Sequence, residues 1–400
     1  MTAAAGPYFD NMQTRFRLDH PEIKVRSVPR NIAGFLDDLF NDSAVTRPVG
    51  DLYIGTHANS DGFLLLQLFR GEVDALGDPY DFTDYEALDQ AMGPSRPAKI
   101  QDSLVGYQRA TPPAQDPPPT HSVHIKGCNI GRDRFSPKPG KPVAPFLVRL
   151  KQVFGNNVNV TAPKHFHGLL AETTHNGMFE YMAQELIVRT KAVPTKKGFR
   201  GFATRNEVID AYKTAKLHYH DGTAIPDDDW DKTLVPKRFA DDRGIAVTIL
   251  LGKTVEGLPA VTIDKQFRIE VEQVDWTLPM SSSMPKDAAG RLAKLTASIA
   301  ADGRFKDTHA WPMYERRGFV DFPSYMAGHD WQFGVSKDGN DLVCTGRRFD
   351  YTIVLPIVDR SVTPVDKRPL IFNYYPGPGS SESPILTGLV ESDNTYFGRA

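Results

Sequence analysis

The first half of the chain alternates short apolar runs with segments of helical periodicity. Val49–Gly55 and Ser122–Lys126 each predict a buried strand that ends at or just before a glycine, because apolar residues run together or alternate within them. Pro145–Phe154 carries apolar residues at helical spacing, and Asn157–Thr161 then alternates as a strand. The order strand, helix, strand with short connections predicts parallel strands joined by a crossover helix.

The second half of the chain has a different pattern. Glu207–Leu217 and Ala288–Ala301 have helical periodicity, whereas Ile225–Asp231 between them is typical of an acidic turn. The predicted strands of this half are Ile245–Leu251, Phe267–Val274, Trp331–Val335, Leu342–Thr345 and Tyr351–Val358. We therefore predict an α/β fold in two parts. Residues 1–190 form a mostly parallel sheet flanked by helices, and residues 191–400 form a strand-rich, mixed α+β region.

The composition of the 400 residues is that of a globular protein with a large core, because 40% are hydrophobic and 24% are charged. A formal net charge of −2 provides no broad basic field, so nucleic acid is not an expected partner. No stretch approaches the roughly 18 apolar residues of a membrane span, and the first residues do not resemble a secretion signal. Two cysteines, Cys128 and Cys344, are too few for a disulfide framework, and Cys344 is expected in the core. We therefore expect a cytoplasmic protein that does not bind membranes.

Two blocks of the sequence carry candidate chemistry. Asp51–Gly62 places His57 in the turn after the first predicted strand, and His121–Gly131 places Cys128 between two glycines after the second. In neighbouring parallel strands both turns lie at one edge of the sheet, where open α/β sheets bind ligands. An imidazole beside a thiol raises the thiolate fraction and can later protonate a leaving amine. The pair therefore indicates nucleophilic catalysis by Cys128 with His57 as general base.

The two blocks resemble those of the caspase-like cysteine peptidases, the superfamily of caspases, metacaspases, gingipains, separases and CHAT-domain proteases. In that superfamily one apolar strand ends in the catalytic histidine and a later strand ends in the catalytic cysteine. The run Cys128-Asn-Ile-Gly131 is similar to the cysteine block of CHAT domains, and the resemblance covers residues 45–170. It implies a caspase-like fold and a cysteine endopeptidase that cleaves peptide bonds through a thioester, with His57 and Cys128 as its dyad. The expected partner is a protein or peptide substrate, and no cofactor is expected.

Five further residues are expected to serve this site. The backbone N–H groups of Ala58 and Gly127 would stabilise the oxyanion, since a glycine beside the cysteine lets a substrate carbonyl approach the main chain. The superfamily usually has glycine directly after the histidine, whereas Ala58 follows it here. Asn129, Lys164 and His165 are expected to line the substrate cleft, because they follow the ends of neighbouring parallel strands.

Two other functions fit parts of the sequence. One is a catalytically inactive caspase-like scaffold or binding module that contacts a regulatory protein through its C-terminal region, and Ala58 in place of glycine favours it. The other is a metal-dependent hydrolase that uses the pairs His165/His167 and His218/His220, whose alternating positions could present two imidazoles on one side. No third and fourth ligand has a convincing spacing, so we predict no metal site.

Overall fold

The chain consists of two compact units of mixed α/β structure with open sheets. A computed structural model describes residues 7–19, 52–56, 58, 121–132, 147–148, 150–151, 158–172, 176–237, 247–252, 262–301, 322–357, 371–387 and 389–400. The first unit contains Met1–Ala183, Val255–Pro259 and Ile357–Ala400, and the second contains Gln184–Thr254 and Ala260–Pro356. The sequence pattern predicts a boundary at residue 190, whereas the first unit ends at Ala183 and also includes the C-terminal residues from Ile357 on. Among the described helices, none is long and apolar enough to cross a lipid bilayer.

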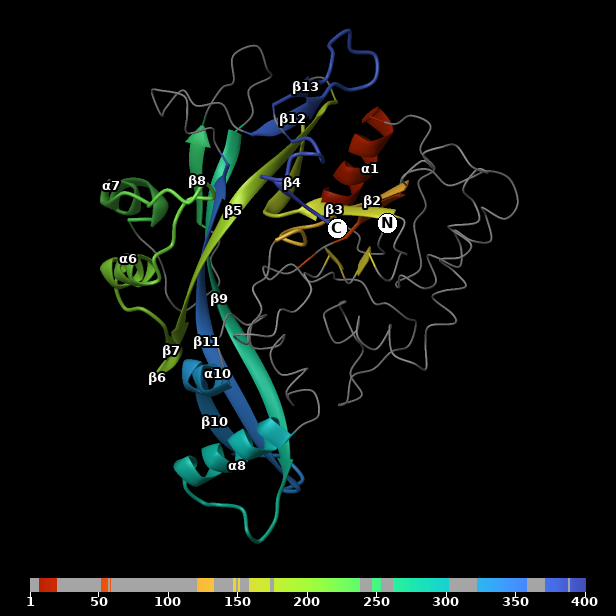
Figure 1. The fold of residues 1–400 in the computed structure, drawn as a ribbon. Helices are drawn as coiled ribbons and strands as arrows, with labels where there is room; N and C mark the ends of the chain where they lie inside the picture. Colours follow the sequence, from red (N-terminus) through yellow and green to blue (C-terminus); the bar gives the residue numbers. More distant parts are fainter. Residues whose placement is uncertain are drawn as a thin grey trace, which may run out of the picture. The chain divides into compact units, whose positions relative to one another are not determined.

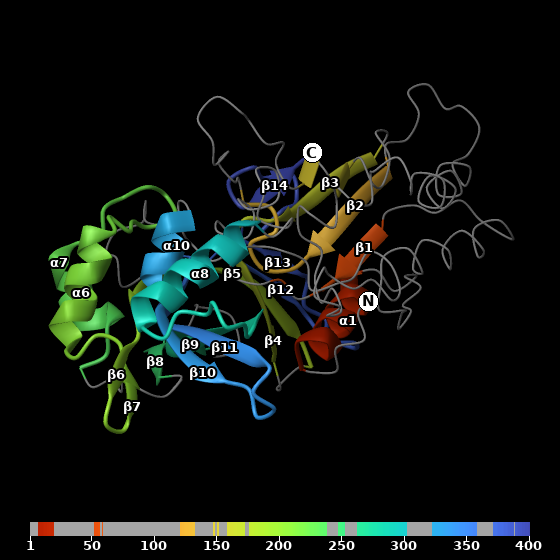
Figure 2. The same ribbon diagram turned by 90° about the horizontal axis from the view of Figure 1, so that it is seen from below.

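The described residues of the first unit contain a four-stranded sheet in the order β1-β2-β3-β14 (Figure 2). Its strands are β1 (Leu52–Gly55), β2 (His121–Lys126), β3 (Val158–Pro163) and β14 (Phe397–Arg399). β1 and β3 both pair with β2 in parallel, and β14 pairs with β3 antiparallel. Of the helix predicted between β2 and β3, residues 147, 148, 150 and 151 are described, and all four are helical. The predicted parallel arrangement of these three strands is confirmed.

Strand β2 is buried on both faces. Val123 and Ile125, at 0% and 1% exposure, point to one face, and His124 and Lys126, at 8% and 2%, point to the other. Burial on both faces is usual for a parallel sheet, because other elements cover each side. A lysine ammonium in such a strand must find an anionic partner, since an unpaired buried charge is very unfavourable.

A second group of strands in the first unit surrounds the first part of β5. The elements are β4 (Phe166–Ala171), β5 (Met178–Lys191), β12 (Phe372–Tyr375) and β13 (Ile385–Leu386). β5 pairs antiparallel with β4 and with β12, and β13 pairs with β12. Helix α1 (Pro7–Asp19) packs Met12 and Phe16 against Leu169 and Met178. The amide of Asn11 also donates to the Leu169 carbonyl at 3.3 Å.

The second unit is built on the long antiparallel pair of β9 and β11 (Figure 1). Its helices, among the described residues, are α6 (Arg205–Thr214), α7 (Asp227–Asp229), η1 (Trp230–Leu234), α8 (Ala288–Ala301) and α10 (Phe322–Gly328). Besides the end of β5, the strands described in this unit are β6 (Val193–Thr195), β7 (Gly198–Arg200), β8 (Val247–Gly252), β9 (Thr262–Pro279), β10 (Asp330–Val335) and β11 (Asp341–Pro356). β8 pairs with β9, β10 pairs with β11, and β6 pairs with β7.

Helix α6 packs its apolar side into an aromatic core of the second unit. The helix begins at a capping box, in which the Thr204 hydroxyl accepts from the N–H of Glu207 and the Glu207 carboxylate accepts from the N–H of Thr204. Tyr212 is fully buried, its ring lies 5.0 Å from that of Trp230, and its hydroxyl donates to the Tyr351 carbonyl at 2.7 Å. The buried hydroxyl is thus satisfied, as packing in an apolar core requires.

Helix α8 has the bounds that its periodicity predicts, Ala288–Ala301. Leu295 and Ile299 are buried against Tyr325 of α10 and Cys344 of β11. Cys344 has no exposed surface, which confirms its predicted place in the core.

The prediction of separate strands at 342–345 and 351–358 is wrong, because both belong to the single strand β11. Residues 346–350 continue the pairing with β9, from Gly346↔Val274 to Asp350↔Glu270. Within this stretch Arg348 is only 2% exposed and forms ion pairs with Glu272 and Asp350. The ion-paired Arg348 interrupts the apolar pattern of the sequence, although the strand β11 continues through it. β9 likewise extends beyond its predicted range of 267–274.

The acidic part of segment 225–231, from residue 227 on, is helical rather than a turn. Asp227–Asp229 form α7, and η1 follows directly. Asp227 forms an ion pair with Lys213 at 3.1 Å, and Asp231 forms one with Arg205 at 2.8 Å. Carboxylates in the first turn of a helix are also favoured by its N-terminal dipole. Cations of α6 therefore compensate the charge that made the segment resemble a solvated turn.

Candidate functional site

Cys128 lies in a tight turn directly after β2 and is half-buried. Its Sγ lies 3.7 Å from the carbonyl oxygen of His167, to which the thiol donates. The next residue, Asn129, has a φ of 59°, in the left-handed region that asparagine tolerates better than most residues. The N–H of Asn129 donates to the His165 carbonyl at 2.9 Å. The turn is therefore fastened to the segment that follows β3.

The turns after β1 and β2 are in direct contact. The N–H of Thr56 donates to the Lys126 carbonyl at 3.0 Å and so continues the strand pairing one residue past β1. A Cβ atom on Gly127 would lie 2.8 Å from the Thr56 carbonyl oxygen and 2.5 Å from the Ile130 side chain. Such separations are shorter than van der Waals contact, so this approach requires glycine. The residue before His57 thus packs on the residue before Cys128.

Of the residues predicted for the site, all but His57 are among the described residues. His57 lies outside the described residues. Ala58, Lys164 and His165 are half-buried, and Gly127 and Asn129 are buried. Of the predicted contacts, the structure brings the Cys128 turn together with His165 through Asn129.

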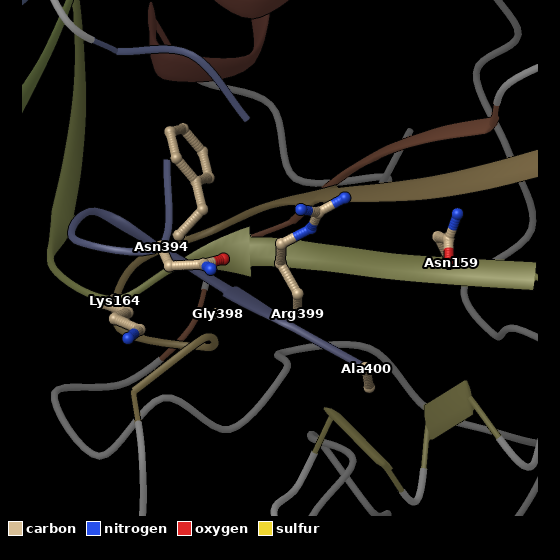
Figure 3. A pocket seen from close by; sticks show the side chains of 7 residues that line it. Asn159, Lys164, Asn394, Gly398, Arg399 and Ala400 are labelled. Atoms are coloured by element: carbon tan, nitrogen blue, oxygen red, sulfur yellow. The ribbon is translucent and has the colours of Figure 1, made fainter. Parts of the chain in front are cut away.

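Lys164 also lines an open pocket of about 470 Å³ between β3 and the C-terminal segment. The other lining residues are Asn159, Asn394, Phe397, Gly398, Arg399 and Ala400, as Figure 3 shows. The N–H of Lys164 donates to the Tyr396 carbonyl at 2.8 Å, and the N–H of Gly131 donates to the Pro163 carbonyl at 2.7 Å. Because Pro163 and His165 both bond the Cys128 turn, this pocket lies beside that turn and presents the cationic side chains of Lys164 and Arg399.

A buried group of charged and polar side chains lies next to the Cys128 turn. We call it the Glu180 cluster, and its members are Arg15, Lys126, His167, Glu180 and Tyr375. One carboxylate oxygen of Glu180 accepts from His167 Nε2 at 2.7 Å and from Lys126 Nζ at 3.3 Å. The other accepts from Arg15 Nη2 at 3.0 Å and from the Tyr375 hydroxyl at 3.3 Å. Five different elements, α1, β2, β4, β5 and β12, thus converge on one carboxylate.

The protonation states within the Glu180 cluster follow from its charges. Burial disfavours the ionised form of Glu180, but the cations Arg15 and Lys126, with the hydrogen bond from His167, hold its pKa well below the usual range. Burial lowers the pKa of His167, and the attraction of Glu180 only partly offsets this effect. His167 is therefore neutral at pH 7, and its Nε2–H donates to the ionised Glu180.

Glu391, in the segment before β14, forms a second carboxylate contact with β2. Its side chain lies 2.7 Å from His124 Nδ1 and 2.5 Å from Lys126 Nζ. His124 Nδ1 is also 2.8 Å from the Thr161 hydroxyl, and its ring stacks on Tyr53 at 4.7 Å. Burial opposes ionisation of Glu391, but Lys126 and the hydrogen bond with His124 outweigh it and lower its pKa to about 2. Lys126 therefore bridges two carboxylates, Glu180 and Glu391.

Most of the Glu180 cluster could not be predicted from the sequence. The one available signal was Lys126, a cation inside an apolar strand, which requires a buried anion. Lys126 and its partner Glu180 are 54 positions apart in the sequence. Arg15, which also binds Glu180, is 165 positions from that glutamate. Nothing in the local pattern connects residues so distant in the chain.

The histidine pairs do not form a metal centre in the described part of the chain. His167 is bound to Glu180, and His165 is half-buried before β4. His218 and His220 lie in the second unit, where His218 Nδ1 is 3.1 Å from the Tyr219 carbonyl. Within the described ranges no group of three histidine, cysteine, aspartate or glutamate side chains could hold a metal ion.

Comparisons with family models, with curated proteins and with solved structures give no match for this chain.

Proposed function

We propose that this chain is a caspase-like cysteine endopeptidase in which Cys128 is the nucleophile and His57 the general base. The observation that carries the proposal is the register of the parallel pair. Partners along β1 and β2 are 71 positions apart, from Leu52↔Val123 to Gly55↔Lys126, and 71 positions also separate His57 from Cys128. Gly55 and Lys126 are paired at the ends of the two strands, and His57 and Cys128 each follow two positions later. Open α/β sheets bind ligands at this edge.

The packing of the two turns supports the same proposal. Gly127 lies against the backbone of Thr56, so the chain segments that carry the two reactive residues touch immediately before them. The half-buried position of Cys128 leaves part of its turn accessible, whereas Cys344 is fully buried. The other requirement is a donor for the oxyanion, and we assign it to the backbone N–H groups of Ala58 and Gly127.

The proposed reaction has two stages. His57 takes the thiol proton, the Cys128 sulfur bonds to the scissile carbonyl carbon, and the carbonyl electron pair moves to oxygen. Collapse of this intermediate breaks the C–N bond, the amine leaves with the proton from His57, and a thioester remains. A water molecule, deprotonated by His57, then attacks the thioester. The carboxylic acid product leaves, and the sulfur regains its proton.

The proposal includes a protein or peptide substrate and a cytoplasmic setting. Cys128 and Cys344 are not joined in a disulfide, and a nucleophilic thiol persists in a reducing compartment. Lys164, Asn129 and His165 border the cleft in this proposal, since they flank the Cys128 turn. We assign recognition of a regulatory protein to the C-terminal region, residues 191–400.

The test is a comparison of the wild-type protein with Cys128→Ala. The matched control is Cys344→Ala, which removes the other thiol from the core of the second unit. Each protein is incubated with a peptide library, and new chain ends are identified by mass spectrometry. We expect cleavage by wild type and by Cys344→Ala and none by Cys128→Ala or His57→Ala.

Different failures point to different alternatives. Equal cleavage by wild type and Cys128→Ala would overturn the peptidase assignment to Cys128. If no protein cleaves, and iodoacetamide alkylates Cys128 no faster in wild type than in His57→Ala, the inactive scaffold is favoured. Cleavage that a chelator abolishes and Zn²⁺ restores would support the metal-dependent hydrolase.

A further inference from the structure

The Glu180 cluster buries several charged side chains, and their transfer out of water opposes folding. Arg15, Lys126 and Glu180 are charged and at most 6% exposed. Replacement of buried ion pairs by apolar residues is often neutral or stabilising in other proteins, so their presence is weak evidence for a role in stability alone. A role in the adjacent site is the alternative explanation.

Two routes connect this cluster to Cys128. The first is the chain itself, because Lys126 precedes Cys128 by two residues and its ammonium contacts Glu180. The second is His167, whose ring is held by Glu180 and whose carbonyl oxygen accepts from the Cys128 thiol. The carboxylate therefore binds both the ring of the residue whose carbonyl contacts the sulfur and the ammonium of a residue two positions before Cys128.

Charged groups of both signs are linked to the Cys128 turn through Lys126, His167 and the segment after β3. The cations are Lys126 on β2, Arg15 on α1 and Lys164 after β3, and the anions are Glu180 on β5 and Glu391 before β14. The neighbouring histidines are His124, His165 and His167. A negative charge close to a thiol disfavours the thiolate, and a positive charge favours it. Removal of an anion and removal of a cation should therefore shift the ionisation of the sulfur in opposite directions.

We propose that Glu180 is a positioning residue for Cys128, which holds the His167 carbonyl against the sulfur and offsets the positive charge of Lys126 and Arg15 beside it. This inference rests on the proposed role of Cys128 as a nucleophile. It adds that Glu180, which does not contact the substrate, determines the reactivity of the Cys128 thiol through His167 and Lys126. α1, through Arg15, contributes to the same setting.

The test measures the rate of Cys128 alkylation by iodoacetamide across pH 5–10 in intact protein. Glu180→Gln removes one negative charge with little change of shape, so the pH midpoint of alkylation should fall by about 0.5–1 unit. Arg15→Gln removes one positive charge from the same cluster, so the midpoint should rise. Opposite shifts are the specific result, because a general loosening of the site would move both midpoints in the same direction.

The matched control is Asp350→Asn in the second unit. Like Glu180, Asp350 is a carboxylate that pairs with arginine, here Arg348 and Arg189, although it is only half-buried. It should leave the midpoint of Cys128 unchanged. The proposal is overturned if both Glu180→Gln and Arg15→Gln leave the midpoint unchanged or shift it in one direction. If Glu180→Gln does not fold, Arg15→Gln alone decides, since its midpoint must rise. Alkylation is measured without a substrate, so this outcome is independent of whether the chain cleaves peptides.

Discussion

The Nε2 atom of His167 lies 2.7 Å from Oε1 of Glu180, and neither side chain is more than 2% exposed. The pair joins β4 to β5, and the carbonyl oxygen of the same His167 accepts from the Cys128 thiol. Because the same carboxylate also binds Lys126 and Arg15, the pair belongs to a network in which charges balance each other. Predictions about its members therefore concern both the stability of the first unit and the environment of the thiol.

Lys126→Met should strongly destabilise the first unit. The substitution leaves Glu180 without one cation and Glu391 without its closest one, and a broken buried ion pair costs about 3–5 kcal/mol. Urea titrations of wild type and variant measure this difference in the free energy of unfolding. The double variant Lys126→Met/Glu391→Gln should recover part of the loss, because it also removes one uncompensated carboxylate. A single variant as stable as wild type would contradict the described pairing.

Glu391→Gln should lower the free energy of unfolding by about 3 kcal/mol at pH 7. The pKa of Glu391 is about 2 in the folded chain against an ordinary value of 4.5, so folding favours its ionised form. This contribution is fully present above pH 4.5 and is lost as the pH falls towards 2. The difference between wild type and variant should therefore shrink between pH 4.5 and 2.

The measurement for Glu391→Gln is a set of urea titrations at pH 7, 5, 4 and 3. Glu382→Gln is the matched control, since that glutamate is exposed in a loop of the same unit. It should leave the stability unchanged at every pH. A constant difference between wild type and Glu391→Gln over the whole range would show that the charge of Glu391 does not cause it.

Cys344 should resist alkylation in the native protein. It has no exposed surface, and burial raises the pKa of its thiol to about 11, so little thiolate forms at pH 8. Mass spectrometry after treatment with iodoacetamide should find label on Cys128 alone, and on both residues in denaturant. Native labelling of Cys344 at the rate of Cys128 would contradict its position in the core.

The sheet edge that carries the candidate site could be predicted because its signals are local. Apolar runs that end at glycines define β1 and β2, and the helical pattern between β2 and β3 indicates parallel strands. The glycine at position 127 also has a physical reason in the structure, because the backbone of Thr56 occupies the space of a side chain. Each of these features depends on neighbours in sequence or on a rule about adjacent strands.

The remaining features depend on contacts between distant residues. β5 has a mixed sequence because Glu180 is directed into a charged cluster, so its pattern does not alternate simply between apolar and polar. Arg348 breaks the apolar pattern of β11 for the same reason, although it continues the strand. The antiparallel strand β14, which pairs with β3 from the far end of the sequence, has only three residues. Short segments and buried charges carry too little local information to be predicted.

Gly131→Ala should destabilise the first unit by at least about 2 kcal/mol, because there is no space for a side chain. A Cβ atom at this position would lie 1.9 Å from the Ala162 carbonyl oxygen and 2.8 Å from the Gly398 nitrogen, and both neighbours are backbone atoms of a sheet. Since Gly131 also bonds Pro163, the clash would separate the Cys128 turn from β3 and change the alkylation rate of Cys128.

The matched control for Gly131→Ala is Gly334→Ala in β10, where no atom lies within 4 Å of the added Cβ. This variant should differ from wild type by less than about 0.5 kcal/mol, as most unstrained surface substitutions do. Thermal and urea unfolding measure both stabilities, and iodoacetamide labelling reports the turn. Equal stability of the two alanine variants would mean that β14 does not pack against the turn after β2, and the pocket that contains Lys164 and Arg399 would lose its wall.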